Sequence, residues 1–282
     1  MKIIDNFLRS ITMYTLMLYF LLVLVGVAVF YSFIGVLAFS PWSIVFSTIV
    51  LMIICLVANK VFAAVFKVAV NPESAYITAL ILSLLFTPVK IIEDFEFLAL
   101  AAFLAIASKF ILAIKGRHLF NPAATAAVVL ALGFNHAASW WVGTSSMLPF
   151  ILAGGLLLLR KIRKDDMVLS FLLVTLATTL SISFLQKGSD PFNLGKAILI
   201  NSPILFFALV MLTEPRITPP TKTLQILYGG LVGLLMTPQL NVNGLYTTPE
   251  IALVGGNVFS YVVSPRGKTA LNFLLAKFKD VS

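Results

Sequence analysis

The sequence predicts an all-α polytopic membrane protein with about ten transmembrane helices, arranged as two inverted repeats that contain short broken helices. Of the 282 residues, 60% are hydrophobic and only 11% are charged, whereas a soluble domain has about 45–50% apolar and about 25% charged residues. The mean hydropathy is +1.04, and the apolar residues form continuous runs rather than the alternation of a transmembrane β-barrel. The single cysteine, Cys55, leaves no partner for an internal disulfide and no Cys-based metal or iron–sulfur site.

Ten hydrophobic segments support the helix count, and dipeptides such as Thr87-Pro88 and Glu214-Pro215 mark the loops between them. No cleavable signal peptide is expected, because the first residues are polar and the apolar run after them reaches the length of about 20 residues that a span needs. The expected segments are 12–35, 43–66, 75–88, 95–114, 121–135, 146–160, 167–186, 194–213, 223–237 and 249–263.

The distribution of basic residues sets the expected orientation. When the segment ends are assigned alternately to two sides, one side receives 17 of the 20 Lys and Arg residues and the other only Lys90, Lys187 and Lys196. Because cytoplasmic loops carry the excess of Lys and Arg, both termini are predicted to be cytoplasmic, with a basic tail at 264–282. The net charge of +9 then reflects loops that face anionic lipid rather than nucleic acid. We expect a multi-pass protein of the plasma (inner) membrane, with the lipid bilayer as a partner.

The chain is predicted to form one transmembrane domain, 1–282, with inverted halves at about 12–135 and 146–263. The third, fourth and fifth segments correspond to the eighth, ninth and tenth. An offset of five, an odd number, inverts the topology, so the segment at Asn121 enters from the cytoplasm and the segment at Pro249 enters from outside. Paired short segments interrupted by Gly or Pro point to a binding site near the bilayer midplane.

Two asparagines are the first candidates for that site. Asn121 can cap a short helix whose first turn accommodates Pro122, and it could equally hydrogen-bond a ligand, so both interpretations stay open. Asn257 lies within an apolar segment, where a polar side chain is a functional candidate, although it could simply join two helices.

Three further polar residues lie in the first half. Lys109 either extends to the cytoplasmic face or meets an anionic ligand. Ser74 and Thr78 are four residues apart and share a helical face, where their hydroxyls either bond a ligand or satisfy backbone carbonyls.

Other charged and aromatic residues have simpler interpretations. Glu214 either pairs with Arg216 or Lys222 or contacts a cation or a partner protein. His118 and His136 are predicted on opposite membrane faces, which excludes a paired metal or haem site. The basic run at 160–164 is interpreted as a membrane anchor, and Trp140 and Trp141 as part of an outer interfacial belt. The paired glycines Gly229-Gly230 and Gly255-Gly256 are interpreted as close helix packing.

Five groups of residues, taken in order, resemble a known family over most of the chain, from about Pro72 to Pro265. They are Ser74-Ala75-Tyr76-Ile77-Thr78-Ala79-Leu80-Ile81-Leu82, Phe120-Asn121-Pro122-Ala123-Ala124, Gly143-Thr144-Ser145-Ser146 before Gly154-Gly155, Thr213-Glu214-Pro215 with Thr218-Pro219, and Gly256-Asn257-Val258-Phe259-Ser260-Tyr261 to Ser264-Pro265. The family comprises the D-type membrane component of Rnf complexes, which are ferredoxin:NAD electron-transport complexes, and the B-type membrane component of sodium-translocating NADH:quinone reductase. The last group is especially similar to relatives in which such a domain precedes a flavin/NAD reductase.

The resemblance implies a ten-helix inverted-repeat fold and a membrane component of an oxidoreductase or ion-translocating electron-transport complex. Such a component passes electrons between a cytoplasmic reductase or iron–sulfur partner and a membrane or outer acceptor. The implied cofactor is FMN or riboflavin, bound between the inverted halves, and the implied partners are other electron-transport subunits or a flavin/NAD reductase. The candidate cofactor-binding residues are Ser74, Thr78, Lys109, Asn121, Pro122, Thr144 and Asn257.

One departure from the family bears on how a flavin is held. Family members with covalent FMN carry a Ser-Gly-Ala-Thr type motif, whose Thr is esterified to the flavin phosphate, in an outward loop after the Asn-Pro segment. Here that loop is short, and its nearest candidates, Thr144, Ser145 and Ser146, lack the Gly-Ala-Thr order. Non-covalent binding is therefore expected. Two alternative functions stay open: a channel or transporter for a small polar solute, and a scaffold for a separately encoded reductase.

Overall fold

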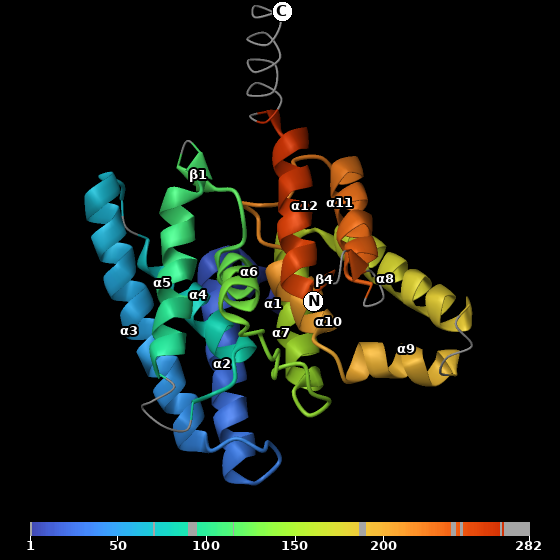
Figure 1. Cartoon of the computed structure of the whole chain (residues 1–282), viewed down its shortest axis with the longest axis horizontal. Helices are drawn as coiled ribbons and strands as arrows, with labels where there is room; N and C mark the ends of the chain where they lie inside the picture. The colour runs from blue at the N-terminus through green and yellow to red at the C-terminus, as the bar shows by residue number, and fades with distance from the viewer. Residues whose placement is uncertain are drawn as a thin grey trace, which may run out of the picture.

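The computed structural model of the chain describes residues 2–69, 71–89, 95–114, 116–185, 190–237, 241–242, 245–265 and 267. This part is almost entirely helical, and its strands form two short antiparallel hairpins, β1 with β2 and β3 with β4 (Figure 1). The elements are α1 (Lys2–Ser10), α2 (Met13–Phe33), α3 (Pro41–Phe66), α4 (Pro72–Leu85), α5 (Phe95–Ile111), β1 (Ala113–Ile114), β2 (Arg117–His118), α6 (Pro122–Phe134), α7 (Leu148–Ile162), α8 (Asp165–Leu185), α9 (Pro191–Ile200), α10 (Ile204–Phe206), η2 (Phe207–Met211), α11 (Lys222–Leu235), β3 (Asn241–Val242), β4 (Leu245–Tyr246) and α12 (Pro249–Val263).

Within the described residues, three helices are long and apolar enough to cross a membrane: α2, α3 and α8. The predicted eighth segment is broken into α9 and the α10–η2 helix, bent by 56°, and this pair makes a fourth span if it is counted as one. The chain is therefore an all-α membrane protein. Each predicted segment contains a helix, but α4, α6, α11 and α12 are shorter apolar helices. The count of ten spans and the inverted repeats thus stay predictions.

Caps and prolines explain where several helices begin. Proline occupies the first turn of α3, α4, α6, α9 and α12, where its missing N–H is not needed. The residues whose side-chain oxygens accept a hydrogen bond from the first turn of a helix are Thr12, Asn71, Asn121, Asp190 and Thr221. These local signals lie in the sequence itself, which is why the segment starts could be predicted closely.

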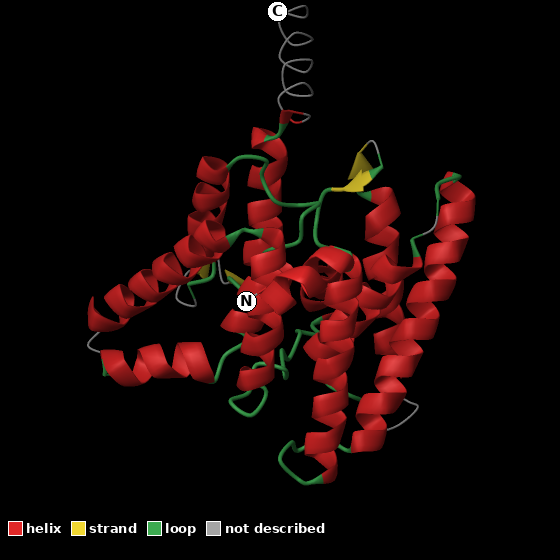
Figure 2. Ribbon diagram, turned by 180° about the vertical axis from the view of Figure 1, so that it is seen from behind, coloured by secondary structure: helices red, strands yellow, loops and turns green. Residues whose placement is uncertain are grey.

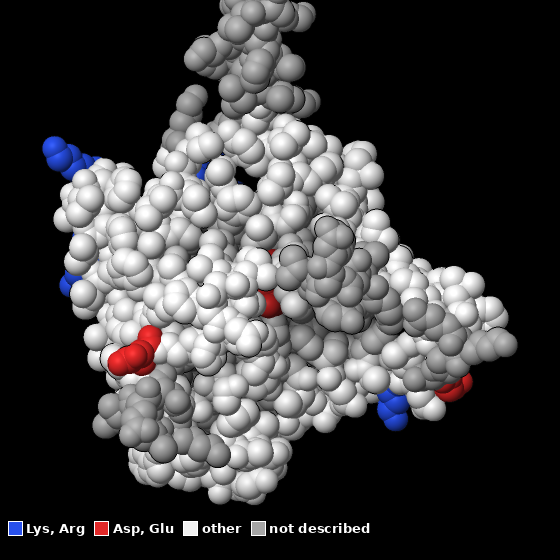
Figure 3. All heavy atoms as spheres, viewed as in Figure 1, with Lys and Arg blue, Asp and Glu red and all other residues white. Residues whose placement is uncertain are grey.

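Helices α2 to α6 pack together as one group, and α8 packs against α9 and α11 as another (Figure 2). Helix α12 contacts both α11 and α6, so it joins the two groups. The face shown in Figure 3 displays few charged atoms among the described residues, as expected where helices meet lipid.

Glycines permit the close approach of α11 to its neighbours. A Cβ atom at Gly229 would lie 2.3 Å from the carbonyl oxygen of Met167, and one at Gly256 would lie 2.3 Å from Val232 Cγ2. The prediction of close packing at these positions is confirmed, and it follows the small-residue rule for helix contacts in membranes.

The predicted interfacial role of Trp140 and Trp141 is wrong for this fold. Both side chains are buried. The Trp140 indole N–H donates to Glu250 Oε2 at 3.1 Å, and the Trp141 N–H donates to the Ser83 and Phe86 carbonyls at 2.9 and 3.0 Å. A buried indole is accommodated when its N–H has such a partner.

Candidate functional site

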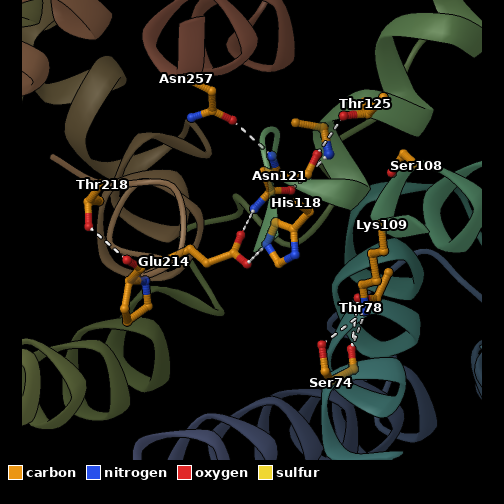
Figure 4. A network of polar contacts seen from close by, with 12 residues as sticks. Ser74, Thr78, Ser108, Lys109, His118, Asn121, Thr125, Glu214, Thr218 and Asn257 are labelled. Atoms are coloured by element: carbon orange, nitrogen blue, oxygen red, sulfur yellow. Dashed lines mark hydrogen bonds and ion pairs between the residues drawn. The ribbon is translucent and has the colours of Figure 1, made fainter. Parts of the chain in front are cut away.

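A network of polar side chains forms where α6 meets α12, and Glu214 lies at its centre (Figure 4). Glu214 follows the α10–η2 helix, the second piece of the broken eighth segment, and its carboxylate points between His118 of β2 and Asn121 at the start of α6. Its Oε1 lies 2.7 Å from His118 Nε2, and its Oε2 accepts a hydrogen bond from Asn121 Nδ2 at 2.9 Å. Both carboxylate oxygens of Glu214 are therefore engaged.

Asn121 connects the predicted halves of the molecule. Its Oδ1 accepts a hydrogen bond from the Ala124 N–H at 3.0 Å, which confirms the cap. Its own backbone N–H donates to Asn257 Oδ1 at 2.8 Å, and Asn257 Nδ2 donates to the Tyr228 hydroxyl at 3.0 Å. Asn121 and Asn257 are 2% and 1% exposed. Because the two residues hydrogen-bond directly, no flavin ring fits between them.

Lys109 lies at the edge of this network and turns toward α4 (Figure 4). Its Nζ donates to the Ser74 carbonyl oxygen at 2.7 Å and to Ser74 Oγ at 3.1 Å. The Thr78 hydroxyl donates to the same carbonyl at 2.9 Å, which is the backbone-satisfying alternative predicted for it. Lys109 is therefore bonded to the first turn of α4.

The charges around Glu214 hold it in its ionised form. Burial alone raises the pKa of the Glu214 carboxyl, but the His118 contact and the cationic Lys109 and Arg216 outweigh burial and hold this pKa below its usual range. Burial also lowers the pKa of the nearby Lys164 to about 8, against the opposing pull of Glu214. The Lys164 ammonium donates to the Thr218 hydroxyl. The network is thus an electrostatically coupled group built around one carboxylate.

A small pocket lies beside this network. Its volume is about 40 Å³, and Glu214 and Lys109 both line it. That volume suits about one water molecule, which occupies about 30 Å³ in the liquid, and it is far below the 300–1,000 Å³ of pockets for small organic ligands. The pocket brings together five of the seven predicted cofactor-binding residues, Ser74, Thr78, Lys109, Asn121 and Pro122.

Thr144 lies apart from these five residues. Its hydroxyl is 3.1 Å from Ser146 Oγ, and the preceding loop packs on the carbonyls of Leu84 and Leu85 at the far end of α4 from Ser74. At 1.5 Å per helical residue, Ser74 and Leu85 are separated by roughly 16 Å along α4. The structure does not bring Thr144 to the network.

Two larger pockets flank Glu214, and His118 and Arg216 line both. One pocket of about 290 Å³ is also lined by Arg117, Asn257 and Tyr261. The other, of about 300 Å³, is also lined by Asn59, Ser74 and Lys109. Their volumes reach the lower end of the range for organic ligands. The first pocket combines the guanidinium groups of Arg117 and Arg216, a group type that suits a phosphate, with the aromatic Tyr261.

Sequence reasoning missed part of this arrangement. His118 was considered only as half of a metal pair, Arg216 only as a loop charge, and Tyr228 was not singled out. The available signal was the position of Glu214 directly after a broken segment, because such breaks expose backbone and charge to a cavity. His136 lies elsewhere, with its ring centroid 4.4 Å from that of Phe97, and the placement of the two histidines on opposite membrane faces stays a prediction.

Among the residues that the structure describes, no group of three or more His, Cys, Asp or Glu side chains is arranged to hold a metal ion. No protein-family model matches the chain, and a search of curated proteins finds no match.

Proposed function

We propose that this chain is a membrane electron-transfer subunit that holds FMN or riboflavin non-covalently in the pocket lined by Arg117, His118, Arg216, Asn257 and Tyr261. In this proposal it passes electrons between a cytoplasmic reductase or iron–sulfur partner and a membrane or outer acceptor, with ion transport coupled to that transfer. The observation that carries the proposal is a pocket of about 290 Å³ that adjoins the polar network in a membrane protein.

The residues around this pocket suit the binding of an anionic aromatic group. Arg117 and Arg216 are exposed at its rim and can donate paired hydrogen bonds to a phosphate. His118 is buried and fixed by Glu214, so it offers a rigid polar wall. A bound flavin would supply the one- and two-electron chemistry, while the protein holds the cofactor and sets its electrostatic environment.

The proposed topology is ten spans in two inverted repeats, with both termini in the cytoplasm. Two kinds of contact support it. Asn121 and Asn257, which occupy corresponding segments of the predicted halves, meet in a hydrogen bond. Helix ends predicted to share the cytoplasmic side also meet, as in the Arg160–Asp5 ion pair and the Lys164–Thr218 contact. Accessibility labelling of single cysteines introduced at Lys67 and at Ser145 tests the topology, because the proposal puts them on opposite sides.

The cofactor proposal is tested on the full chain purified in detergent. We expect a visible flavin absorption band, release of FMN or riboflavin on denaturation, and no flavin-modified peptide by mass spectrometry. For FMN, Arg117→Gln and Arg216→Gln should each weaken retention about tenfold, because a hydrogen bond to a charged group contributes about 1.5–3 kcal/mol. The matched control, Lys67→Gln, removes an exposed charge outside the pocket and should retain flavin normally. Wild-type protein that carries and rebinds no flavin contradicts the proposal.

A second candidate function, a channel or transporter for a small polar solute, is favoured by the pocket of about 40 Å³ between Lys109 and Glu214. That pocket is bounded by the start of the short helix α6, the kind of terminus that binds polar groups in transporters. Solute flux into liposomes that contain the flavin-free protein would support this candidate. Flux equal to that of empty liposomes would remove it.

A further inference from the structure

A large cavity lies far from the polar network along the chain, between the N-terminal helix α1 and the end of α7. Its volume is about 760 Å³, well within the range for organic ligands. Its lining combines the apolar Leu8, Leu156 and Leu159 with charged side chains from α1, α7 and the start of α8. Nothing in the proposed electron-transfer function uses this cavity.

The charge in the cavity is positive. Four basic residues, Arg9, Arg160, Lys161 and Arg163, line it together with two acidic residues, Asp5 and Asp165. Two of the basic residues, both in α7, bind residues of α1 across the cavity. Arg160 pairs with Asp5, with Nε to Oδ1 at 3.0 Å and Nη2 to Oδ2 at 3.1 Å, and the Lys161 ammonium donates to the Leu8 carbonyl.

The other two basic residues are available for a ligand. Among the residues that the structure describes, neither the Arg9 nor the Arg163 side chain has a hydrogen-bond or ion-pair partner, and both residues are exposed. A guanidinium group favours a phosphate because it can donate two parallel hydrogen bonds to it. The cavity therefore offers two unpaired phosphate-binding groups above an apolar wall.

Helix α1 has the character of a helix that lies at a membrane surface. Asp5 and Arg9, four residues apart, share the face that lines the cavity. Leu8, which lines the same cavity, is buried, whereas Phe7 is 49% exposed. A short helix with a charged face, a buried leucine and an exposed phenylalanine fits the boundary between headgroups and acyl chains.

We propose that this cavity binds the phosphate headgroup of an anionic phospholipid, with Arg9 and Arg163 on the phosphate and the leucines beside the first part of an acyl chain. A lipid is favoured over a free phosphate because the same cavity offers both the basic rim and the apolar wall, in a membrane protein whose bilayer supplies such lipids. The site is separate from the flavin pocket, so it stands or falls independently of the proposed function.

The test uses the full chain in a neutral detergent, with native mass spectrometry to count bound phosphatidylglycerol and phosphatidylcholine. We expect phosphatidylglycerol to bind more tightly than phosphatidylcholine. Arg9→Gln and Arg163→Gln should each weaken phosphatidylglycerol binding about fivefold, and the double variant about 25-fold. The reason is that each basic residue near an anionic membrane surface contributes a binding free energy that corresponds to about a fivefold change in affinity. Arg163→Lys keeps the charge but loses the paired hydrogen bonds, so it should bind less phosphatidylglycerol than wild type and more than Arg163→Gln.

Three results would overturn the assignment. Equal binding of both lipids would show that the cavity does not select an anionic headgroup. Loss of binding in the control Lys67→Gln, whose exposed charge lies outside the cavity, would show that overall surface charge is responsible. Saturable binding of inorganic phosphate that fully displaces phosphatidylglycerol would identify a soluble phosphate instead. Thermal unfolding of every variant, measured in parallel, separates lost binding from lost folding.

Discussion

The polar network around Glu214 and the cavity beneath α1 contrast in how they treat polar groups. In the network, Asn121 hydrogen-bonds both Glu214 and Asn257, and the pocket that Glu214 itself lines has only about 40 Å³. In the cavity, Arg9 and Arg163 are exposed beside about 760 Å³ of space. Both regions are rich in polar atoms, yet one is closed by mutual hydrogen bonds and the other is open.

This difference distinguishes polar groups that stabilise the fold from polar groups that can bind a ligand. Buried polar groups that satisfy one another fix a geometry, and they are costly to disturb because each lost partner leaves a desolvated group. Exposed unpaired cations cost little to the fold and retain their capacity for an external anion. We therefore expect network variants to lower stability and cavity variants to change ligand affinity alone.

The largest effect is expected from Glu214→Leu. This change leaves His118 and Asn121 without their acceptor beside Lys109 and Arg216, and breaking a buried charged network by removing one partner costs about 3–5 kcal/mol. Thermal or denaturant unfolding of the purified chain measures the loss. Glu214→Gln keeps an acceptor for Asn121 and should lose less. The exposed Glu96 provides the control, and Glu96→Leu should change stability by less than about 0.5 kcal/mol. Equal stability of the two Leu variants would contradict the structural role of the network.

The next effect is a rise in stability with pH that Lys164 causes. Its pKa is lowered to about 8 in the folded chain from an ordinary value of 10.5, so between these values the unfolded chain binds more protons than the folded one. Stability should therefore increase as pH rises through this window, by about 3 kcal/mol in total. Glu214 acts in the same direction, in a window at low pH. Its folded pKa is lowered, so its contribution is present above the ordinary Glu pKa and is lost as pH falls through the folded value.

The alkaline rise is tested by unfolding measurements on wild type and Lys164→Met across this range. The variant should lack the Lys164 part of the rise and be at least as stable as wild type near neutral pH. If the stability of the variant rises by the same amount, groups other than Lys164 cause the rise.

A smaller loss is expected from Asn257→Ala. The change removes the acceptor of the Asn121 backbone N–H and the partner of the Tyr228 hydroxyl. Side-chain hydrogen bonds within membranes contribute about 0.6 kcal/mol on average, so two bonds predict a loss of about 1 kcal/mol. Val258→Ala, at the exposed neighbouring position of α12, is the matched control in the unfolding measurement. If the control loses as much as Asn257→Ala, the truncation of a side chain on this helix rather than the hydrogen bonds explains the loss.

The sequence predicted the local features of this site better than its assembly. The helix start at Asn121-Pro122 is encoded by adjacent residues, and the cap is confirmed by the Ala124 contact. The joining of Asn121 to Asn257 spans 136 positions and could be anticipated only through the predicted repeat. Thr144 was grouped with the site by motif order alone, and the fold puts it at the other end of α4.

Aromatic residues show the same limit. Hydropathy predicts that Trp140 lies near a membrane surface, but it cannot reveal that a buried Glu250 supplies a partner for the indole N–H. That partner is 110 positions away. Local capping and periodicity are therefore readable from the chain, whereas the satisfaction of buried polar groups depends on packing between distant segments.

The smallest effect on stability is expected where the cavity is altered. Arg9→Gln and Arg163→Gln remove exposed charges that have no partner among the described residues, so each should change the free energy of unfolding by less than about 0.5 kcal/mol in lipid-free detergent. With phosphatidylglycerol added, wild type should gain stability because a ligand that binds only the folded state raises its unfolding free energy. The variants should gain less. These two measurements distinguish cavity residues from network residues, because a substitution in the network would lower the unfolding free energy in both conditions. A loss in lipid-free detergent as large as that of Asn257→Ala would mean that the two arginines support the fold instead of binding a ligand.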